Sequence, residues 1–301
     1  MKHFLRVLPL LLLMTATAFS APAFSAPAQD KDKPAYRIFT KAGKASSYAK
    51  MLAGLQEPEV VLFGELHNDP IAHWLQLELA RDLHRAYGAQ LVIGAEMFET
   101  DVQLVLDEFL AGQIPEANFE QEARPWPNYK TDYRPLVRFA KEKSIPFVAT
   151  NVPRRYAALV AKEGLAALAP LSAEAKRLMA PLPITVDLQL PSYQKMLTMF
   201  GPETHSSKKE QVVQAQALKD ATMASFILRQ LLPGRKLLHL NGGYHSDYFE
   251  GIGWYLRQAQ PQLRFATITT VQQDDLSSLA EEHRGKADFI IVVPTGMTRT
   301  H

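Results

Sequence analysis

The stretch Val60-Val61-Leu62-Phe63-Gly64-Glu65-Leu66-His67-Asn68-Asp69-Pro70 decides the fold class of this chain. Its apolar start predicts a strand that is buried on both faces. Its end predicts the start of a helix, because Asp69 can cap free N–H groups and Pro70 fits the first helical position. Glu65 and His67 therefore follow a strand at the edge of an open α/β sheet, where ligands bind.

Buried strands and amphipathic helices alternate along the rest of the chain. Further strands are expected at 91–96, 146–151, 236–241, 263–269 and 288–293, and helices at 71–87, 101–111, 133–143, 208–232 and 247–259. This alternation predicts an α/β fold with a mostly parallel central sheet and helices on both faces. We expect residues 36–301 to form a single domain, in which the helix-rich segment of about 154–210 forms a cap over the crevice.

The composition and the N-terminus indicate where the protein works. With 33 Lys and Arg against 31 Asp and Glu, and no long run of like charge, binding to nucleic acid is not expected. Two basic residues, a short apolar core and small residues predict a signal peptide over 1–28, followed by a tether at 29–35. No later segment is apolar enough to be transmembrane, and the chain has no cysteine to lipidate. We therefore expect a soluble protein that is periplasmic or otherwise exported.

Polar side chains follow each of the first four strands. Glu65 and His67 come after the first, Glu96 ends the second, Asn151 ends the third and His245 follows the fourth. A single polar residue is ordinary at the end of a strand. Because parallel strands bring their carboxyl ends to one edge, all of them together favour a functional site.

The first and fourth strands end in the same pattern. Gly64-Glu-Leu-His67-Asn-Asp69 and Gly242-Gly-Tyr-His245-Ser-Asp247 both read Gly-x-x-His, a polar residue and an Asp that is expected to cap the next helix. Two imidazoles and two carboxylates form the candidate site: Glu65, His67, Glu96 and His245. This set could bind a divalent metal such as Zn, Mn or Co, or act in general acid/base catalysis.

The long helix expected at 208–232 adds a further acid. Gln216, Asp220, Met223 and Ile227 recur at helical spacing and so share one face. Asp220 is either hydrogen-bonded to Gln216 beside an apolar stripe or faces the crevice, where it would orient a histidine.

Several of these motifs occur in the order typical of a known family. They are Gly64-Glu-Leu-His67, Glu96 in Gly-Ala-Glu-Met-Phe-Glu, Tyr133-Arg-Pro-Leu136, Asn151-Val-Pro153, Gln216 with Asp220-Ala-Thr-Met223-Ala, and Gly242-Gly-Tyr-His245. Over about residues 50–270 the chain resembles the ChaN-like family of haem-binding, iron-regulated proteins, in a superfamily with erythromycin esterases and TIKI-type metalloproteases. The resemblance implies haem uptake and a homodimer around two haems. A tyrosine of one subunit would ligate iron, and a histidine of the other would contact a propionate. It also implies a haem-uptake receptor or transporter as a possible partner.

The motifs do not settle which residues hold haem. Haem needs an apolar slot, an axial ligand and groups that bind the propionates. Within 193–200, Tyr193, Met196, Leu197 and Phe200 share a helical face, which is typical either of core packing or of a slot for a flat apolar ligand. We expect Tyr193 as axial ligand, with Tyr129 and Tyr133 as the next candidates, and His205 at a propionate.

Two functions follow from the sequence. The first is a periplasmic haem-binding protein that acts in haem uptake or iron acquisition. The second is a metal-dependent or acid/base hydrolase that uses Glu65, His67, Glu96, His245 and Asp220. In the hydrolase His67 would be the base that activates water, and Glu65 or Glu96 a metal ligand or an orienting group.

Overall fold

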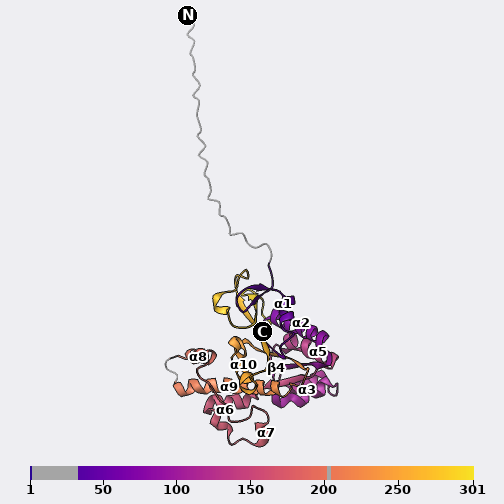
Figure 1. Cartoon of the computed structure of the whole chain (residues 1–301), viewed down its shortest axis with the longest axis vertical. Helices are drawn as coiled ribbons and strands as arrows, with labels where there is room; N and C mark the ends of the chain where they lie inside the picture. The colour runs from indigo at the N-terminus through magenta and orange to yellow at the C-terminus, as the bar shows by residue number, and fades with distance from the viewer. Residues whose placement is uncertain (2–32, 202–204) are drawn as a thin grey trace. The chain divides into compact units, whose positions relative to one another are not determined.

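An eight-stranded sheet, in the order β2-β1-β8-β7-β3-β6-β4-β5, forms the centre of the computed structural model (Figure 1). Its strands are β1 Arg37–Thr40, β2 Ala45–Ser46, β3 Val60–Glu65, β4 Leu91–Glu99, β5 Phe147–Asn151, β6 Lys236–Gly242, β7 Phe265–Gln273 and β8 Phe289–Pro294. Strands β3 to β8 run parallel, and β1 and β2 add an antiparallel edge. The prediction of a mostly parallel sheet is thus confirmed.

The structure describes residues 1, 33–201 and 205–301. The expected signal peptide and most of the expected tether lie outside these residues. Pro34–His301 forms one compact unit. No helix in the described part of the chain is long and apolar enough to cross a membrane.

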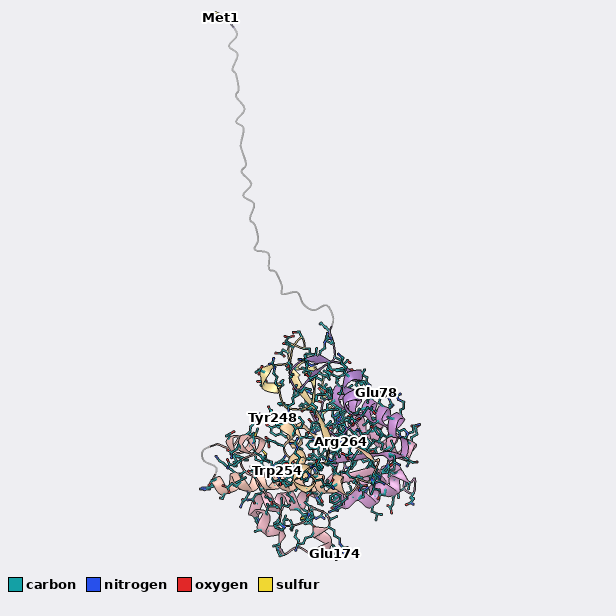
Figure 2. All side chains as sticks on the ribbon, viewed as in Figure 1. Met1, Glu78, Glu174, Tyr248, Trp254 and Arg264 are labelled. Atoms are coloured by element: carbon teal, nitrogen blue, oxygen red, sulfur yellow. The ribbon has the colours of Figure 1, made fainter. Side chains whose placement is uncertain are left out.

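Helices cover both faces of the sheet, as expected. One face packs against α2 Pro70–Tyr87, α3 Gln103–Leu110, α4 Glu116–Glu122 and α5 Arg134–Lys143. The other packs against α9 Ser206–Leu228 and α10 Ile252–Ala259. Figure 2 labels one residue of each layer, Glu78 of α2 and Trp254 of α10. Each large apolar side chain that is fully buried contributes about 1.5–3 kcal/mol, so the two-sided burial of the central strands is a major stabilising term.

The key strand β3 shows how the sequence produces this two-sided burial. Its side chains alternate, so that Val61 and Phe63 enter the core beside α2, whereas Val60 and Leu62 enter the core beside α9 and α10. The turn after β3 leads directly into α2. There the Asp69 carboxylate accepts hydrogen bonds from the backbone N–H groups of Ile71 and Ala72, at 3.0 and 2.9 Å, as the sequence predicts.

The helix-rich segment forms a layer of its own against α9. It contains α6 Arg154–Glu163, the 3₁₀ turn η4 Leu165–Leu168, α7 Ala173–Lys176 and α8 Pro191–Thr198. Its small core joins side chains of α6 and η4 to Ala215 and Leu218 of α9. Between α7 and α8 the backbone is not helical, in a stretch that includes Pro181 and Pro183. The remaining helical elements are α1 Tyr48–Gly54, η1 Gly88–Gln90, η2 Thr100–Val102, the π-helical turn η3 Tyr129–Tyr133, η5 Gly243–His245, η6 Asp247–Phe249 and η7 Glu281–His283.

The helix after β6 begins later than expected. Tyr248 and Phe249 have positive φ angles of 59° and 63°, which interrupt the helical path, and α10 starts at Ile252. Asp247 therefore does not cap this helix, and that prediction is wrong. Its carboxylate instead accepts a hydrogen bond from the Thr269 hydroxyl at 2.6 Å and lies 3.3 Å from the Lys286 ammonium.

Candidate functional site

The two Gly-x-x-His turns meet because their strands are neighbours in the sheet. In the parallel pair β3 and β6, Glu65 lies opposite Gly242. Strand β4 pairs with β6 on the other side, and its register against β5 shifts between Ala95 and Glu99. Glu96 lies within this irregular part of β4, and its Oε2 accepts a hydrogen bond from the Gly242 N–H at 2.7 Å. The polar residues that follow these strands therefore come to one edge of the sheet, as the sequence predicts.

A cavity of about 1010 Å³ opens at this edge. Glu65, His67, Glu96 and His245 all line it. Its apolar lining includes Trp126, Met196, Met199 and the ring of Tyr244. Both methionines lie in the segment that was expected to form the cap: Met196 belongs to α8 and Met199 comes just after it. Residues that are far apart in the sequence thus line one cavity. Its polar side chains follow the strands, and its apolar side chains come from other segments of the chain.

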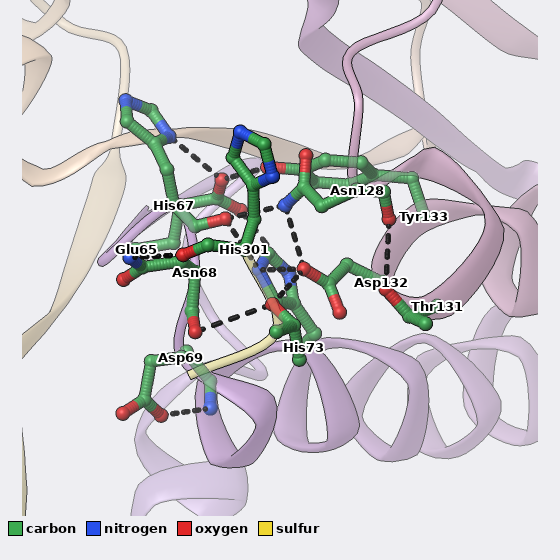
Figure 3. Close-up of polar contacts among 12 residues, drawn as sticks. Glu65, His67, Asn68, Asp69, His73, Asn128, Thr131, Asp132, Tyr133 and His301 are labelled. Carbon is green, nitrogen blue, oxygen red and sulfur yellow. Dashed lines mark hydrogen bonds and ion pairs between the residues drawn. The ribbon is translucent and has the colours of Figure 1, made fainter. Parts of the chain in front are cut away.

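Glu65 is buried and accepts three hydrogen bonds (Figure 3). The donors are Tyr133 Oη at 2.6 Å, Gln76 Nε2 at 2.6 Å and His67 Nδ1 at 3.0 Å. Burial acts to raise the pKa of Glu65, but the bond from His67 and the charges of His73 and His67 outweigh it and lower the pKa. Glu65 is therefore ionised, and His67 Nδ1 carries the donated hydrogen.

His67 is the accessible histidine of the pair, with 50 % of its side chain exposed. Burial acts to lower its pKa, but the hydrogen bond to Glu65 and the charge of Glu96 outweigh it and raise the pKa. The ring packs edge-to-face on Trp126, with 4.8 Å between centroids. Because Nδ1 is held by Glu65, Nε2 is the nitrogen available to a ligand.

A polar shell beneath this turn fixes its backbone (Figure 3). The carbonyl oxygen of His67 accepts a hydrogen bond from Asn128 Nδ2 at 2.6 Å and lies 3.2 Å from His73 Nε2. Asn128 Nδ2 also donates to Asp132 Oδ2 at 2.6 Å, and the Thr300 hydroxyl donates to the same oxygen at 2.5 Å. Sequence reasoning missed these residues. Asn128 lies in an irregular, Pro-rich segment of the sequence, and nothing in that segment indicates that its side chain bonds to the backbone of His67.

His245 lies between two carboxylates and is only 5 % exposed. Its Nε2 is 3.1 Å from Glu96 Oε1, and its Nδ1 is 2.5 Å from Asp220 Oδ1. Burial acts to lower its pKa, but the charges of Glu96 and Asp220 outweigh it and raise the pKa to about 10. His245 is therefore an imidazolium at neutral pH. Of the two arrangements open for Asp220, the structure has the one in which it contacts a histidine.

The same geometry bears on metal binding. Both nitrogens of His245 face carboxylates, so neither lone pair is free for a metal ion unless a proton leaves. Across residues 33–201 and 205–301, no group of three or more His, Cys, Asp or Glu side chains is arranged to hold a metal ion. The four predicted site residues instead assemble as two histidine–carboxylate pairs, His67 with Glu65 and His245 with Glu96.

The tyrosines expected to bind haem are buried away from the cavity wall. Tyr193 is 1 % exposed and donates to Asp220 Oδ2 at 2.8 Å, Tyr133 donates to Glu65, and Tyr129 packs in the core. Burial raises the pKa of all three hydroxyls, which disfavours the phenolate that iron requires. His205 is exposed and flanks the start of α9, outside the residues that line the cavity.

A different tyrosine lines the cavity. Tyr244, within the second Gly-x-x-His turn, is 48 % exposed. Among the described residues that line the cavity it is the one tyrosine. Tyr244 lies inside the motif Gly242-Gly-Tyr-His245, which could have marked it as a candidate. The sequence alone does not show whether a side chain of this turn faces the cavity.

A family model described as haem-binding uptake, Tiki superfamily, ChaN matches residues 51–256. Among solved structures, ChaN of Campylobacter jejuni, reported with cofacial haem binding, shares 17 % identity over 86 % of this chain and 96 % of that one, with a TM-score of 0.66. The type III effector HopBA1 shares 12 % identity over 82 % and 92 %, with a TM-score of 0.48. An erythromycin esterase in its open conformation shares 13 % over 85 % and 82 %, with a TM-score of 0.45. No curated protein sequence matches significantly.

Proposed function

Because this chain belongs to the ChaN family of haem-binding uptake proteins, we propose that it is an exported protein that binds haem for haem uptake or iron acquisition. The observation that carries this proposal is the cavity of about 1010 Å³ at the strand ends. Its size is at the upper end of ordinary ligand sites, and its Met and Trp side chains suit a flat apolar ligand. Export rests on the signal-like pattern of residues 1–28.

We assign the axial ligand to Tyr244 rather than to Tyr193. Tyr244 is half-exposed on the cavity wall, so its hydroxyl can reach an iron atom without rearrangement of the fold. Tyr193 would have to leave a site where it is 1 % exposed and give up its bond to Asp220. A buried acceptor left without its donor costs about 1–3 kcal/mol, which disfavours that route.

A homodimer that forms on haem binding is part of the proposal. The cavity is open to the outside, so a haem on its Met and Trp wall would keep one face uncovered. A second copy with its own haem would cover that face. The apolar area removed from water would then favour association at roughly 25 cal/mol per Å². A haem-uptake receptor or transporter would deliver or receive the ligand.

An absorption titration with haemin, beside size-exclusion chromatography, tests the proposal. We expect a saturable Soret band with a tyrosinate-type visible spectrum and a shift from monomer to dimer. Tyr244→Phe should weaken binding and change that spectrum, whereas the matched Tyr193→Phe should keep both. A wild-type spectrum identical to that of free haemin would overturn the haem-binding proposal, and loss of binding in Tyr193→Phe alone would overturn the assignment of the ligand.

The geometry of His67 also supports a hydrolase as a second candidate. Its Nδ1 donates to an ionised carboxylate, and its Nε2 is available at the cavity, which is the arrangement of a general base. A metal-dependent form with Zn, Mn or Co would additionally have to displace the proton of His245. Ester and amide hydrolysis should then be measurable, with and without added metal, and Glu65→Gln should reduce it. Absence of activity under both conditions would rule out this candidate.

A further inference from the structure

The segment that follows β8 crosses one side of the large cavity. It starts after Pro294, where the Thr295 hydroxyl donates a hydrogen bond to the carboxylate of Asp274, just beyond β7. It ends at the β3–α2 turn, and β7 lies between β8 and β3 in the sheet. Residues 295–301, which we call the strap, therefore pass the carboxyl end of β7 to reach this turn, and His301 lines the cavity.

Polar contacts hold the far end of the strap on the β3–α2 turn. The Asn68 carbonyl oxygen accepts a hydrogen bond from the Thr300 N–H at 3.1 Å, and Asn68 Nδ2 donates to the carbonyl oxygen of His301 at 3.1 Å (Figure 3). Arg299 Nη1 lies 3.1 Å from Oδ2 of Asp69, whose side chain is fully buried and caps α2. The strap thus supplies a positive charge that balances this carboxylate.

A hydrogen-bond relay links the strap to His67. The Thr300 hydroxyl donates to Asp132 Oδ2 at 2.5 Å, and Asn128 Nδ2 donates both to that oxygen and to the His67 carbonyl oxygen, at 2.6 Å each. Asp132 is 6 % exposed, so these bonds are shielded from water and support one another. The position of the His67 backbone therefore depends in part on whether Thr300 is in place.

The strap has no apolar anchor. None of the apolar cores formed by the described residues includes a side chain from 295–301, and each residue of the strap is at least partly exposed. Each hydrogen bond contributes little net free energy because it replaces bonds to water, whereas each ordered residue loses conformational entropy. Gains and costs are therefore of similar size, which is typical of segments that unfold locally while the rest of the fold stays intact.

We propose that residues 295–301 are a releasable strap. When docked, it locks the His67 turn and closes one side of the cavity. When released, it frees the turn and opens a path for a ligand along β7. A ligand that contacts both His67 and His301 would favour the docked state, because those contacts exist together only when the strap is in place.

Hydrogen–deuterium exchange of the wild-type protein tests whether the strap is docked and whether it is released locally. The Thr300 N–H should be protected, because it is bonded to Asn68. It should nevertheless exchange roughly a hundredfold faster than the amides of β8, because the strap opens locally whereas a core strand opens only with the whole fold.

The variant Thr300→Val removes the hydroxyl and nearly keeps the shape of the side chain. Loss of its bond to the Asp132 carboxylate should raise the exchange rates of the strap and of residues 66–69 about tenfold. Because Leu66, His67 and Asn68 line the cavity, their exchange reports the opening of this side without any ligand. Thr300→Ser keeps the hydroxyl and should restore the wild-type rates. The matched control Thr298→Val changes an exposed residue of the same strap and should behave as wild type.

Stopped-flow kinetics with haemin measure passage into the cavity. In Thr300→Val, haemin should associate and dissociate about tenfold faster than in wild type and in Thr298→Val, because the fraction of open molecules rises by that factor. This part of the experiment rests on the haem-binding function proposed above, whereas the exchange measurements do not.

The outcomes are distinguishable. Equal exchange rates in wild type and Thr300→Val, or a wild-type Thr300 N–H that exchanges as slowly as β8, would overturn the releasable strap. Faster exchange with unchanged haemin kinetics would overturn its role in ligand entry. Wild-type protein that binds no haemin would overturn the haem-binding function, and the exchange of residues 66–69 would then decide by itself whether the strap locks and opens this side of the cavity.

Discussion

The turns Gly64-x-x-His67 and Gly242-x-x-His245 share a sequence pattern and lie on adjacent strands, yet they hold their histidines in opposite environments. The side chain of His67 is half-exposed and contacts one carboxylate, Glu65. His245 is buried between two carboxylates, Glu96 and Asp220. The Gly-x-x-His pattern therefore determines where in the fold the imidazole lies. Residues from β4 and α9, distant in the sequence, decide whether it can exchange its proton with a ligand.

The largest expected effect comes from removal of the buried cation. His245→Gln leaves Glu96 and Asp220 buried without a positive partner, so we expect a loss of about 3–5 kcal/mol in the free energy of unfolding. The matched variant His67→Gln, at a half-exposed pair, should lose less than about 1 kcal/mol. Urea denaturation of both variants measures the difference. Equal losses would show that the two histidines are not in different environments.

The pH dependence of stability should report the same buried pair. The pKa of His245 is raised to about 10 from 6.5, so its stabilising charge is fully present below about pH 6.5 and is lost as the pH rises through 10. We expect wild-type stability to fall over this window by an amount on the order of a few kcal/mol. Denaturation at pH 6, 8 and 10 measures it, and His245→Gln should flatten the profile. A flat wild-type profile would contradict the imidazolium assignment.

The first glycines of the two turns should differ in how they tolerate a side chain. A Cβ on Gly64 would meet backbone atoms, Gly243 Cα at 3.0 Å and the Ile268 carbonyl oxygen at 3.1 Å. A Cβ on Gly242 would meet the ring of His67, with Cε1 at 2.7 Å, and that half-exposed ring can move. We expect Gly64→Ala to cost about 1–3 kcal/mol and Gly242→Ala less than about 1 kcal/mol. Thermal melting tests the order, and the reverse order would refute it.

The smallest expected effect is on the ionisation of His67. Glu65→Gln removes the carboxylate whose hydrogen bond raises the pKa of His67, so that pKa should fall toward its ordinary value. An NMR titration of the His67 ring protons measures the change. The same substitution should leave the pKa of His245 near its wild-type value, because Glu65 does not contact it. A parallel shift of both histidines would mean that the two turns titrate as one unit.

The parallel core was predictable because its strands are short apolar runs between helical patterns, and periodicity is a local property. Strands β1 and β2 were missed because they are short, of four and two residues, with little apolar pattern. The helix after β6 was placed too early because the positive φ angles of Tyr248 and Phe249 have no signature in a run of ordinary residues.

The candidate site was only partly predictable for a related reason. Glu65, His67, Glu96 and His245 could be brought together because parallel strands share an edge. The exposure of Tyr193 and Tyr244 could not be inferred, since both lie in segments with mixed polar and apolar residues and only tertiary packing distinguishes them. The partners of Glu65 from α2 and η3 likewise depend on how those elements pack.

The edge-to-face contact between Trp126 and His67 gives the protein an internal optical probe. A protonated imidazole quenches indole fluorescence more strongly than a neutral one, and the two centroids are 4.8 Å apart. Of the three tryptophans in the chain, Trp126 is the one among the described residues that lines the cavity. In a variant with Trp74 and Trp254 replaced by Phe, emission intensity would therefore follow the charge state of His67 in solution, without any added label.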